Sequence, residues 1–440
     1  MASTAKPPAA TSAGIQTALE RIQKLFDTGS FVELSQMVEC GVVTGCGAVE
    51  GRLVYAYSQY GAVNASHAGK IARLYEAALQ MGAPIVAVLS SKGAAVAEGM
   101  QVLDAYGRIF ASMADASGVV PQIAVVAEAC AGTAAFIPAM SDFVIMPEHG
   151  ARLFLESPAA SPEEAAKTTT PGVMGNAVAC ATNGLAHFVA TTVDDTMLLV
   201  KELLAYLPSN NLDEAPIGMF LDELARPDMT DADGGVHVYD LLANVADNQR
   251  YLECRKAYEP SVVTCFLRLN GYTVGVTVSN GALTPGACEK AAAFIRFCDA
   301  FNLPIVSLSA AAAYDMKIAA QKDTIAAGAK LMAAFAQATT PKVNVLVGTS
   351  VGSPYVMMNS AHLSADVTFA WDTARISVLA IDAAQKVLDT ALAAAPEEVA
   401  ALGYIDQVIR PKETRGKLIA ALESLNSKRA SRHAKKHGTV

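Results

Sequence analysis

Two short turns of small residues could place hydrogen-bond donors where a reaction needs them. The sequence CAGT spans 130–133 and VGSP spans 351–354, and each follows an apolar segment and precedes a predicted helix. The first N–H groups of a helix have no acceptor within the helix and carry a partial positive charge. They can polarise a carbonyl group and stabilise the oxyanion formed when that carbonyl enolises, provided that small residues let it approach the main chain. One such turn could be a plain tight connection, but two related turns are stronger evidence.

The two turns belong to an internal repeat with an offset of 220 residues. Between 42–90 and 262–310, twelve of the 49 aligned positions are identical without a gap. The matches include the Gly, Pro and Lys positions Gly51/Gly271, Gly61/Gly281, Lys70/Lys290 and Pro84/Pro304, and later Pro121/Pro341 and Gly132/Gly352. A bias toward alanine would not align glycine and proline at one offset, so the pattern indicates a duplicated domain.

Each half of the repeat predicts the same elements. A strand–turn–strand over 42–57 precedes a helix with apolar residues at helical spacing, Ile71, Leu74 and Ala78. A buried strand over 84–89, a helix over 100–114, a strand over 123–126, a turn over 129–132 and a helix through 139 follow. The second half repeats this order, with strands at 304–308 and 343–347, a helix over 324–338 and a turn over 349–353. This alternation predicts an α/β fold with parallel strands.

The composition excludes several classes of protein. Of the 440 residues, 52% are hydrophobic and only 17% are charged, which is too apolar for a disordered chain. The net charge of −9 disfavours general nucleic-acid binding, because an acidic chain repels phosphates. The apolar run 122–146 contains Glu128 and Asp142 and is interrupted by Gly132 and Pro138, so it does not predict a membrane helix. We expect a soluble protein.

The sequence predicts two domains and two tails. A Pro- and Asp-rich stretch at 207–233 separates the repeats, and we place the domains at 16–225 and 226–427. Residues 1–15 predict a flexible tail and residues 428–440 a basic one. The beginning of the chain has no secretory signal, and the eight cysteines form no CxxC pair, so we expect a cytoplasmic protein that binds no metal.

Other catalytic patterns are missing or weak. The seven histidines stand in no nucleophile context, and GxSxG, HExxH, GxGxxG and the Walker lysine loop are absent. A helix start predicted over 91–94, which contains Ser91, Lys92 and Gly93, favours an anion, and Lys92 could meet a phosphate, although a solvent-facing lysine is the commoner outcome. Glu98 is better explained as a helix-surface or salt-bridging residue than as a general base.

Several longer segments together resemble one family. They are GVVTGCGAVEGRLVYAYSQ (41–59), APIVAVLSSKGAAVAEG (83–99), ASGVVPQIAVVAEACAGTAAFIPAMSDFVIM (116–146), LPSNN (207–211), FIRFCDAFNLPIV (294–306) and GYIDQVIRPKETR (403–415). Their order is similar to that in the carboxyltransferase subunit of biotin-dependent acyl-CoA carboxylases and decarboxylases, of the propionyl-CoA carboxylase β and methylmalonyl-CoA decarboxylase α type. The resemblance covers nearly the whole chain.

The resemblance implies a fold, an assembly and partners. The fold is two crotonase-like domains of the ClpP/crotonase superfamily, each a spiral of β-β-α units, related by internal duplication. The assembly is a homohexamer, a dimer of trimers, with the acyl-CoA site between the N-domain of one subunit and the C-domain of another. The implied partner is a biotin carboxyl carrier protein, with a biotin carboxylase subunit or a membrane decarboxylase subunit as further partners, and no nucleic acid.

The resemblance also implies a reaction. Biotin on the separate carrier would give CO2 to, or take it from, the carbon next to the thioester of an acyl-CoA such as propionyl-CoA or methylmalonyl-CoA. Carried over by position, the first turn would hold the thioester enolate and the second the ureido oxygen of biotin. The implied catalytic residues are Gly132, Thr133, Gly352 and Ser353. The implied cofactor-binding residues are Ser91, Lys92, Gly93, Ala131, Pro354 and Val356, and the apolar Val356 would suit a methyl-bearing or longer acyl group.

The chain departs from the family pattern at these sites. The family's DSGGARIQEG is SSKGAAVAEG here, so that Lys92 replaces a glycine and Ala95 an arginine. YGGSY is VGSPY, and Pro354 has no N–H to donate. If that donor matters, its loss could cost about 3 kcal/mol of barrier, although proline is also simply favourable in the first turn of a helix. A large rate gain in Pro354→Gly would support the missing-donor argument.

Three hypotheses for function follow. The first is a working carboxyltransferase or decarboxylase subunit. The second is a degenerate, non-catalytic paralogue with a structural or regulatory role in such a complex, which the losses at the turns favour. The third, a CoA hydratase or isomerase, is weakened by the full duplication and by the lack of a convincing carboxylate at either turn. Turnover in a transcarboxylation assay with free biotin and a panel of malonyl-type thioesters would remove the second hypothesis.

Overall fold

The computed structural model describes residues 12–36, 40–91, 93–155, 175–220, 237–311, 313–314, 321–379 and 393–431. Within it the chain forms two compact units, Met1–Asp213 and Glu214–Val440. The predicted limit between residues 225 and 226 lies outside the described residues, as do Lys92 and the end of the basic tail. Helix α1 already begins at Ser12, inside the predicted N-terminal tail.

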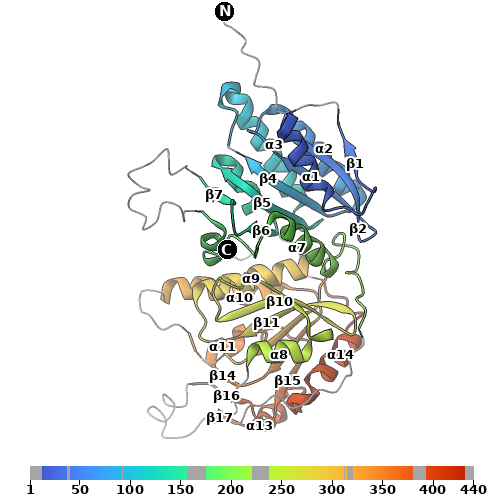
Figure 1. Ribbon diagram of the computed structural model, residues 1–440. Coiled ribbons are helices and arrows are strands. Elements are labelled where there is room, and N and C mark those ends of the chain that lie inside the picture. Colours follow the sequence, from blue (N-terminus) through green and yellow to red (C-terminus); the bar gives the residue numbers. More distant parts are fainter. Residues whose placement is uncertain are drawn as a thin grey trace, which may run out of the picture. The chain divides into compact units, whose positions relative to one another are not determined.

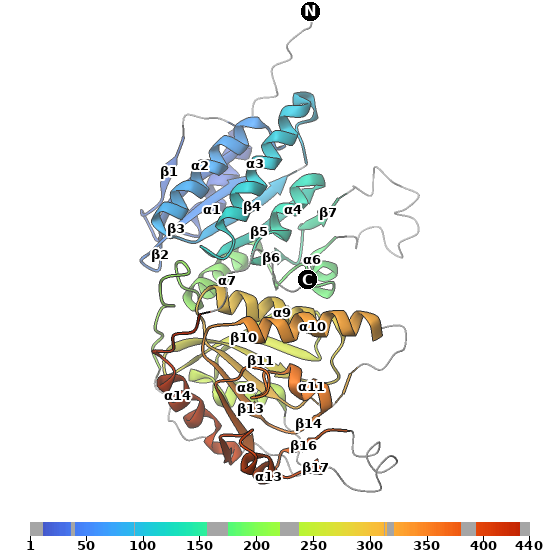
Figure 2. The ribbon, with the colours of Figure 1, turned by 180° about the vertical axis from the view of Figure 1, so that it is seen from behind.

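The N-terminal unit is a mixed sheet with helices packed against it (Figures 1 and 2). Its main strand order is β1-β2-β3-β4-β5-β6-β8, and β7 pairs with the end of β5. The first three strands are antiparallel, and β3 to β8 run parallel, as the alternation of strands and helices predicts. Its elements are α1 (Ser12–Gln23), β1 (Val32–Leu34), β2 (Val42–Val49), β3 (Arg52–Gln59), α2 (Ala65–Met81), β4 (Ile85–Ser91), the 3-10 helix η1 (Val96–Glu98), α3 (Met100–Ala116), β5 (Gln122–Ala131), η2 (Gly132–Ala135), α4 (Phe136–Ala139), β6 (Phe143–Pro147), β7 (Arg152–Phe154), α6 (Ala177–Thr182), β8 (Phe188–Ala190) and α7 (Val193–Tyr206).

The C-terminal unit has a second sheet of the same kind. Its strand order is β18-β15-β13-β12-β11-β10-β9, and a smaller sheet, β14-β16-β17, lies beside the second turn. Helices α9 and α10 run side by side in both views (Figures 1 and 2). Its elements are α8 (Val238–Val245), η3 (Asp247–Gln249), β9 (Tyr251–Cys254), β10 (Val262–Leu269), β11 (Tyr272–Ser279), α9 (Pro285–Ala300), β12 (Ile305–Ser309), α10 (Gln321–Gln337), β13 (Lys342–Leu346), β14 (Thr349–Val351), α11 (Gly352–Met357), β15 (Val367–Trp371), β16 (Arg375–Ser377), β17 (Ala393–Ala394), α13 (Pro396–Ala401), β18 (Gln407–Ile409), η5 (Pro411–Glu413) and α14 (Thr414–Ser424).

The duplication extends to the pairing of individual residues. Val42 pairs with Gln59 in the first hairpin, and Val262 pairs with Ser279 in the second, each 220 positions later. The isolated bridge Val63–Ala94 is likewise repeated as Leu283–Tyr314. The lysines of the repeat are buried in both units, but their acceptors are not equivalent: Lys70 Nζ donates to the Val42 carbonyl at 2.9 Å, and Lys290 Nζ to the Tyr258 carbonyl at 2.8 Å. The glycine, proline and lysine matches in the sequence therefore mark one backbone used twice.

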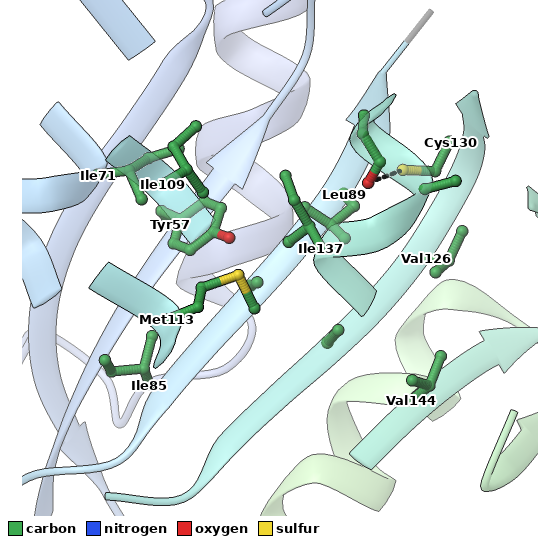
Figure 3. Close-up of a cluster of buried hydrophobic side chains, with 14 of the residues drawn as sticks. Tyr57, Ile71, Ile85, Leu89, Ile109, Met113, Val126, Cys130, Ile137 and Val144 are labelled. Atoms are coloured by element: carbon green, nitrogen blue, oxygen red, sulfur yellow. Dashed lines mark hydrogen bonds between the residues drawn. The ribbon is translucent and has the colours of Figure 1, made fainter. Parts of the chain in front are cut away.

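A buried apolar cluster between the first sheet and helices α2 and α3 holds strand β5 in place (Figure 3). Strand β4 contributes five consecutive buried apolar residues, the pattern of a strand covered on both faces. At the end of β5, the thiol of Cys130 donates to the carbonyl oxygen of Ala134 at 3.3 Å, the dashed line in Figure 3. Burial raises the pKa of Cys130 to about 12, so the thiol stays protonated and serves as this donor. The core thus fixes the strand that carries the first turn.

The two predicted turns begin later than the sequence suggests. Residues 129–131 belong to β5 and residues 349–351 form β14, so the predicted turns over 129–132 and 349–353 are wrong at their first three positions. The reason is a pairing partner far along the chain: Ala129 pairs with Arg152 of β7, and Thr349 pairs with Arg375 of β16. Small residues that look like a turn in isolation become a strand when another strand is available.

Candidate functional site

The first turn begins at the carboxyl end of β5. Gly132 has φ +66°, a left-handed conformation that strongly favours glycine, and it opens the 3-10 helix that continues into α4. Gly132 and Thr133 are the first two residues of this helical segment, so their N–H groups have no acceptor within it. Ala131, the last residue of β5, is half-buried beside them. The geometry therefore suits donation of two N–H groups to one oxygen.

The second turn repeats this geometry in the C-terminal unit. Gly352 has φ +53°, and a Cβ atom added there would lie 3.1 Å from the carbonyl oxygen of Val378, so the position requires glycine. Gly352 and Ser353 are the first two residues of α11. Val356, one turn further along α11, is half-buried.

The position of Pro354 changes the argument about the missing donor. Under the offset of 220, Gly352 and Ser353 correspond to Gly132 and Thr133, whereas Pro354 corresponds to Ala134, the third residue of the helical segment. Pro354 removes an N–H group, but not one of the two that correspond to the first turn. Both turns therefore retain their leading pair of N–H donors.

A tyrosine that the sequence analysis did not select contacts the second turn. Tyr314 Oη donates to Ser353 Oγ at 2.6 Å and lies 3.6 Å from Met357 Sδ. Burial raises the pKa of the Tyr314 phenol above its usual value, so the hydroxyl is protonated at neutral pH. Tyr314 ends the segment 310–314, where the family pattern reads DVPGF, but no spacing in the sequence predicts a contact between residues 39 positions apart.

A polar cluster near the first turn was also missed. Ser90 Oγ donates to Glu128 Oε2 at 2.6 Å, and Arg21 of α1 forms an ion pair with Glu128 Oε1. Glu128 stands where the pairing of β4 and β5 shifts register, between Val126 and Cys130. Irregularities of this kind re-aim side chains at sheet edges and sites. The carboxylate at this turn is thus paired with an arginine.

The predicted phosphate-binding turn has a different local structure. Strand β4 extends through Ser91, and the next helical turn begins only at Val96, so the helix start predicted at 91–94 is wrong. The N–H of Gly93 donates to Ser91 Oγ at 3.2 Å, a local bond that satisfies this donor. Glu98 is half-buried and accepts from the Ala65 N–H at 2.9 Å at the start of α2, a helix-terminus contact that the sequence did not predict.

The part of the chain that the structure describes was searched for metal-binding groups and for membrane-spanning helices. No group of three or more His, Cys, Asp or Glu side chains there could hold a metal ion. Within the same ranges, every helix is too short or too polar to cross a membrane.

Comparison with known proteins places this geometry in a family. Residues 9–394 match the carboxyl transferase domain family. The methylmalonyl-CoA decarboxylase α subunit of Veillonella parvula is 36% identical, over 97% of this chain and 93% of that protein. The methylmalonyl-CoA carboxyltransferase 12S subunit of Propionibacterium freudenreichii subsp. shermanii is 35% identical over 97% and 92%.

A solved structure gives the same result. The transcarboxylase 12S hexamer with hydrolysed methylmalonyl-CoA bound is 34% identical, with a TM-score of 0.90 over 96% of this chain and 92% of that one. The chain therefore belongs to the carboxyl transferase domain family. The predicted family and the predicted α/β fold of two duplicated crotonase-like domains are both confirmed.

Proposed function

We propose that this chain is the carboxyltransferase subunit of a biotin-dependent acyl-CoA carboxylase or decarboxylase. It moves a carboxyl group between carboxybiotin, on a separate carrier protein, and the α carbon of an acyl-CoA such as propionyl-CoA or methylmalonyl-CoA. The observation that carries the proposal is the pair of equivalent turns, each opened by a glycine at positive φ. Two relatives with 35–36% identity along nearly the whole chain are named for methylmalonyl-CoA, which supports the substrate class.

Each turn binds one of the two substrates, the first turn the acyl-CoA and the second turn the biotin of the carrier. The N–H groups of Gly132 and Thr133 hold the thioester oxygen and stabilise the enolate that forms when the α carbon loses its proton or its carboxyl group. The N–H groups of Gly352 and Ser353 hold the ureido oxygen of biotin, which fits a turn built to donate to a carbonyl-type oxygen. In the carboxylation direction the N–C bond of carboxybiotin breaks, the ureido nitrogen receives the α proton, and the enolate carbon bonds to CO2.

The residues around the turns have supporting roles in this proposal. Ala131, Pro354 and Val356 line the turns, and Val356 favours a methyl-bearing or longer acyl group. The predicted contact of Ser91, Lys92 and Gly93 with the CoA or biotin portion has less support, because Ser91 is buried and its Oγ already accepts the Gly93 N–H. The chain assembles as a hexamer, as the similar transcarboxylase 12S does, and binds a biotin carboxyl carrier protein. The cytoplasm is the proposed location.

The non-catalytic alternative has less support. It rested on losses clustered at the turns, but the structure retains the leading N–H pair at both. The relatives matched over nearly the whole chain are named as carboxyltransferase and decarboxylase subunits.

A transcarboxylation assay tests the proposal directly. Purified protein is incubated with free biotin or biotinylated carrier and with malonyl-, methylmalonyl- and ethylmalonyl-CoA, and transfer of the carboxyl group is measured. We expect turnover with at least one ester. Gly132→Ala and Gly352→Ala keep the N–H groups but disfavour the positive φ that orients them, so we expect kcat to fall about 100-fold in each variant. Absence of turnover with every ester and both acceptors would support the non-catalytic alternative.

The chain offers matched controls for backbone strain. Gly29 (φ +76°) and Gly403 (φ +80°) also have positive φ, and an added Cβ would meet no atom within 4 Å at either. Gly29→Ala and Gly403→Ala therefore place a Cβ at a positive φ in the N-terminal and C-terminal units, outside the two turns that begin at Gly132 and Gly352. Both should retain normal turnover.

A further inference from the structure

The second turn has a side-chain hydrogen bond that joins two separate segments. Tyr314 lies in the segment after β12, and Ser353 and Met357 lie on α11. The backbone next to Tyr314 is fixed by pairing with Leu283, whose N–H donates to the Ala313 carbonyl at 3.0 Å. The phenol therefore reaches Ser353 from an anchored position, at 2.6 Å.

Among the described residues the first turn has no such pair, and the duplication identifies the equivalent positions. The bridge partner that corresponds to Tyr314 is Ala94, whose methyl group cannot form a hydrogen bond. The residue that corresponds to Ser353 is Thr133. The Tyr314–Ser353 bond is therefore a feature of the C-terminal unit and not a requirement of the shared backbone.

The direction of the bond leaves one donor available. A hydroxyl group has one hydrogen to donate and two lone pairs to accept with. Of the two acceptors near the Tyr314 hydroxyl, Ser353 Oγ at 2.6 Å is closer and stronger than Met357 Sδ at 3.6 Å, so Ser353 takes the one hydrogen and keeps its own for another acceptor. The Ser353 side chain is exposed at the opening of α11, next to its own backbone N–H.

We infer that Ser353 donates its side-chain hydroxyl, in addition to its N–H, to the oxygen bound at the second turn, and that Tyr314 is the positioning residue that orients this hydroxyl. The inference rests on the proposed function, in which that oxygen is the ureido oxygen of biotin. The second turn would then have three donors, the two leading N–H groups and the Ser353 hydroxyl. The unit that binds biotin would thus differ from the one that binds the acyl-CoA.

A set of four variants in the transcarboxylation assay tests this inference, with kcat and KM measured separately for free biotin and for the acyl-CoA. Ser353→Ala and Tyr314→Phe should each lower kcat/KM for biotin about tenfold, because one donor is lost or disordered. The acyl-CoA KM should stay within about twofold. The double variant should be no worse than Ser353→Ala alone, because Tyr314 acts only through Ser353. Ser353→Thr keeps the hydroxyl and should recover most of the activity.

Tyr272→Phe is the matched control, because it removes the same atom from a half-exposed tyrosine on β11 of the same unit. It should behave as wild type. Tyr314→Phe with unchanged biotin kinetics, additive losses in the double variant, or an equal rise in the acyl-CoA KM would each overturn the inference. If the wild type transfers no carboxyl group, the proposed function fails together with it. If the wild type is active and only the variants disagree, the inference alone fails.

Discussion

In each unit, an aspartate accepts hydrogen bonds from the turn of the duplicated hairpin (β2–β3 and β10–β11). The two aspartates are equivalent in sequence but have different surroundings. In the N-terminal unit, the carboxylate of Asp27 accepts from the N–H groups of Glu50 and Gly51 at 3.0 and 2.9 Å. In the C-terminal unit, Asp247 accepts from those of Asn270 and Gly271, each 220 positions later. Asp247 is buried and forms an ion pair with the buried Arg415, whereas Asp27 lies near the surface.

The comparison shows which feature of the aspartates is required by the backbone and which depends on burial. Two N–H groups of a tight turn need an acceptor in both units, and the aspartate is retained in both. The second unit buries this aspartate, and a buried charge needs a partner, which Arg415 of α14 provides. Asp27 and Asp247 thus accept equivalent hydrogen bonds, but we expect the free energy of unfolding to depend more on the buried Asp247.

Removing the buried arginine should have the largest effect on stability. Arg415→Met leaves the Asp247 carboxylate buried without its cation, which we expect to cost about 3 kcal/mol or more of unfolding free energy. The loss should appear in the C-terminal unit, and hydrogen exchange of the segment 262–279 measures it separately from the N-terminal segment 42–59.

Two further variants sharpen this prediction. Asp247→Asn combined with Arg415→Met should recover part of the loss, because no unpaired charge is then buried. Arg410→Met, which breaks an exposed ion pair with Glu413, should change little. A loss of equal size in Arg410→Met would show that the burial of the Asp247–Arg415 pair is not the cause.

A second difference between the units concerns acid stability. His67 occupies the third position of α2, and its Nδ1 accepts from the Asn64 N–H at 3.2 Å. Ala287 occupies this position in α9. Burial lowers the pKa of His67 to about 4, with the nearby Lys70 acting in the same direction. Since the folded pKa lies below the unfolded value, the neutral side chain stabilises the N-terminal unit above about pH 6.5, and this contribution is lost as the pH falls toward 4.

The size of this effect can be measured by comparison with a variant. At pH 5 the loss should be about 2 kcal/mol relative to pH 7, because one pKa unit corresponds to about 1.4 kcal/mol. Unfolding of the wild type and of His67→Gln is followed from pH 7 to 5, and the variant should show a shallower decline. His362→Gln, at an exposed histidine of the other unit, is the control. Parallel declines in wild type and His67→Gln would contradict the assignment.

The sequence predicted the internal duplication but not the side-chain contacts between segments that are far apart along the chain. The glycine, proline and lysine matches predicted the duplication, because these residues meet backbone needs that recur at fixed positions. The aspartates at 27 and 247 share the offset and could have been found the same way. The Tyr314–Ser353 and Arg21–Glu128 contacts could not, because each joins segments whose distance depends on tertiary packing.

A third comparison contrasts the residues beneath the two turns. In the first, Cys130 donates its thiol to the Ala134 carbonyl. In the second, the equivalent Ser350 is buried, and its hydroxyl has no hydrogen-bond partner among the described residues. Ser350→Cys should stabilise the C-terminal unit by about 1 kcal/mol, because a thiol costs less to bury than an unpaired hydroxyl.

The control for this substitution is another buried serine of the same unit. Ser360 Oγ donates to the Val356 carbonyl at 3.3 Å, so Ser360→Cys weakens a bond and should not stabilise. Thermal unfolding of both variants is compared with wild type. Equal stabilisation in the two would indicate a general preference for cysteine and not the relief of an unpaired hydroxyl.

The smallest effect is expected where the sequence suggested one of the largest. Pro354→Ala gives the second turn the residue that the first turn carries at Ala134 and restores the N–H. Because Gly352 and Ser353 already supply the pair of N–H groups that corresponds to the first turn, we expect kcat to change by less than about threefold, which is under about 0.7 kcal/mol of barrier. A gain of tenfold or more would instead show that the third N–H contacts the reacting oxygen. The two turns would then differ in function because of a single missing donor, and their shared geometry would explain less of the catalysis than proposed.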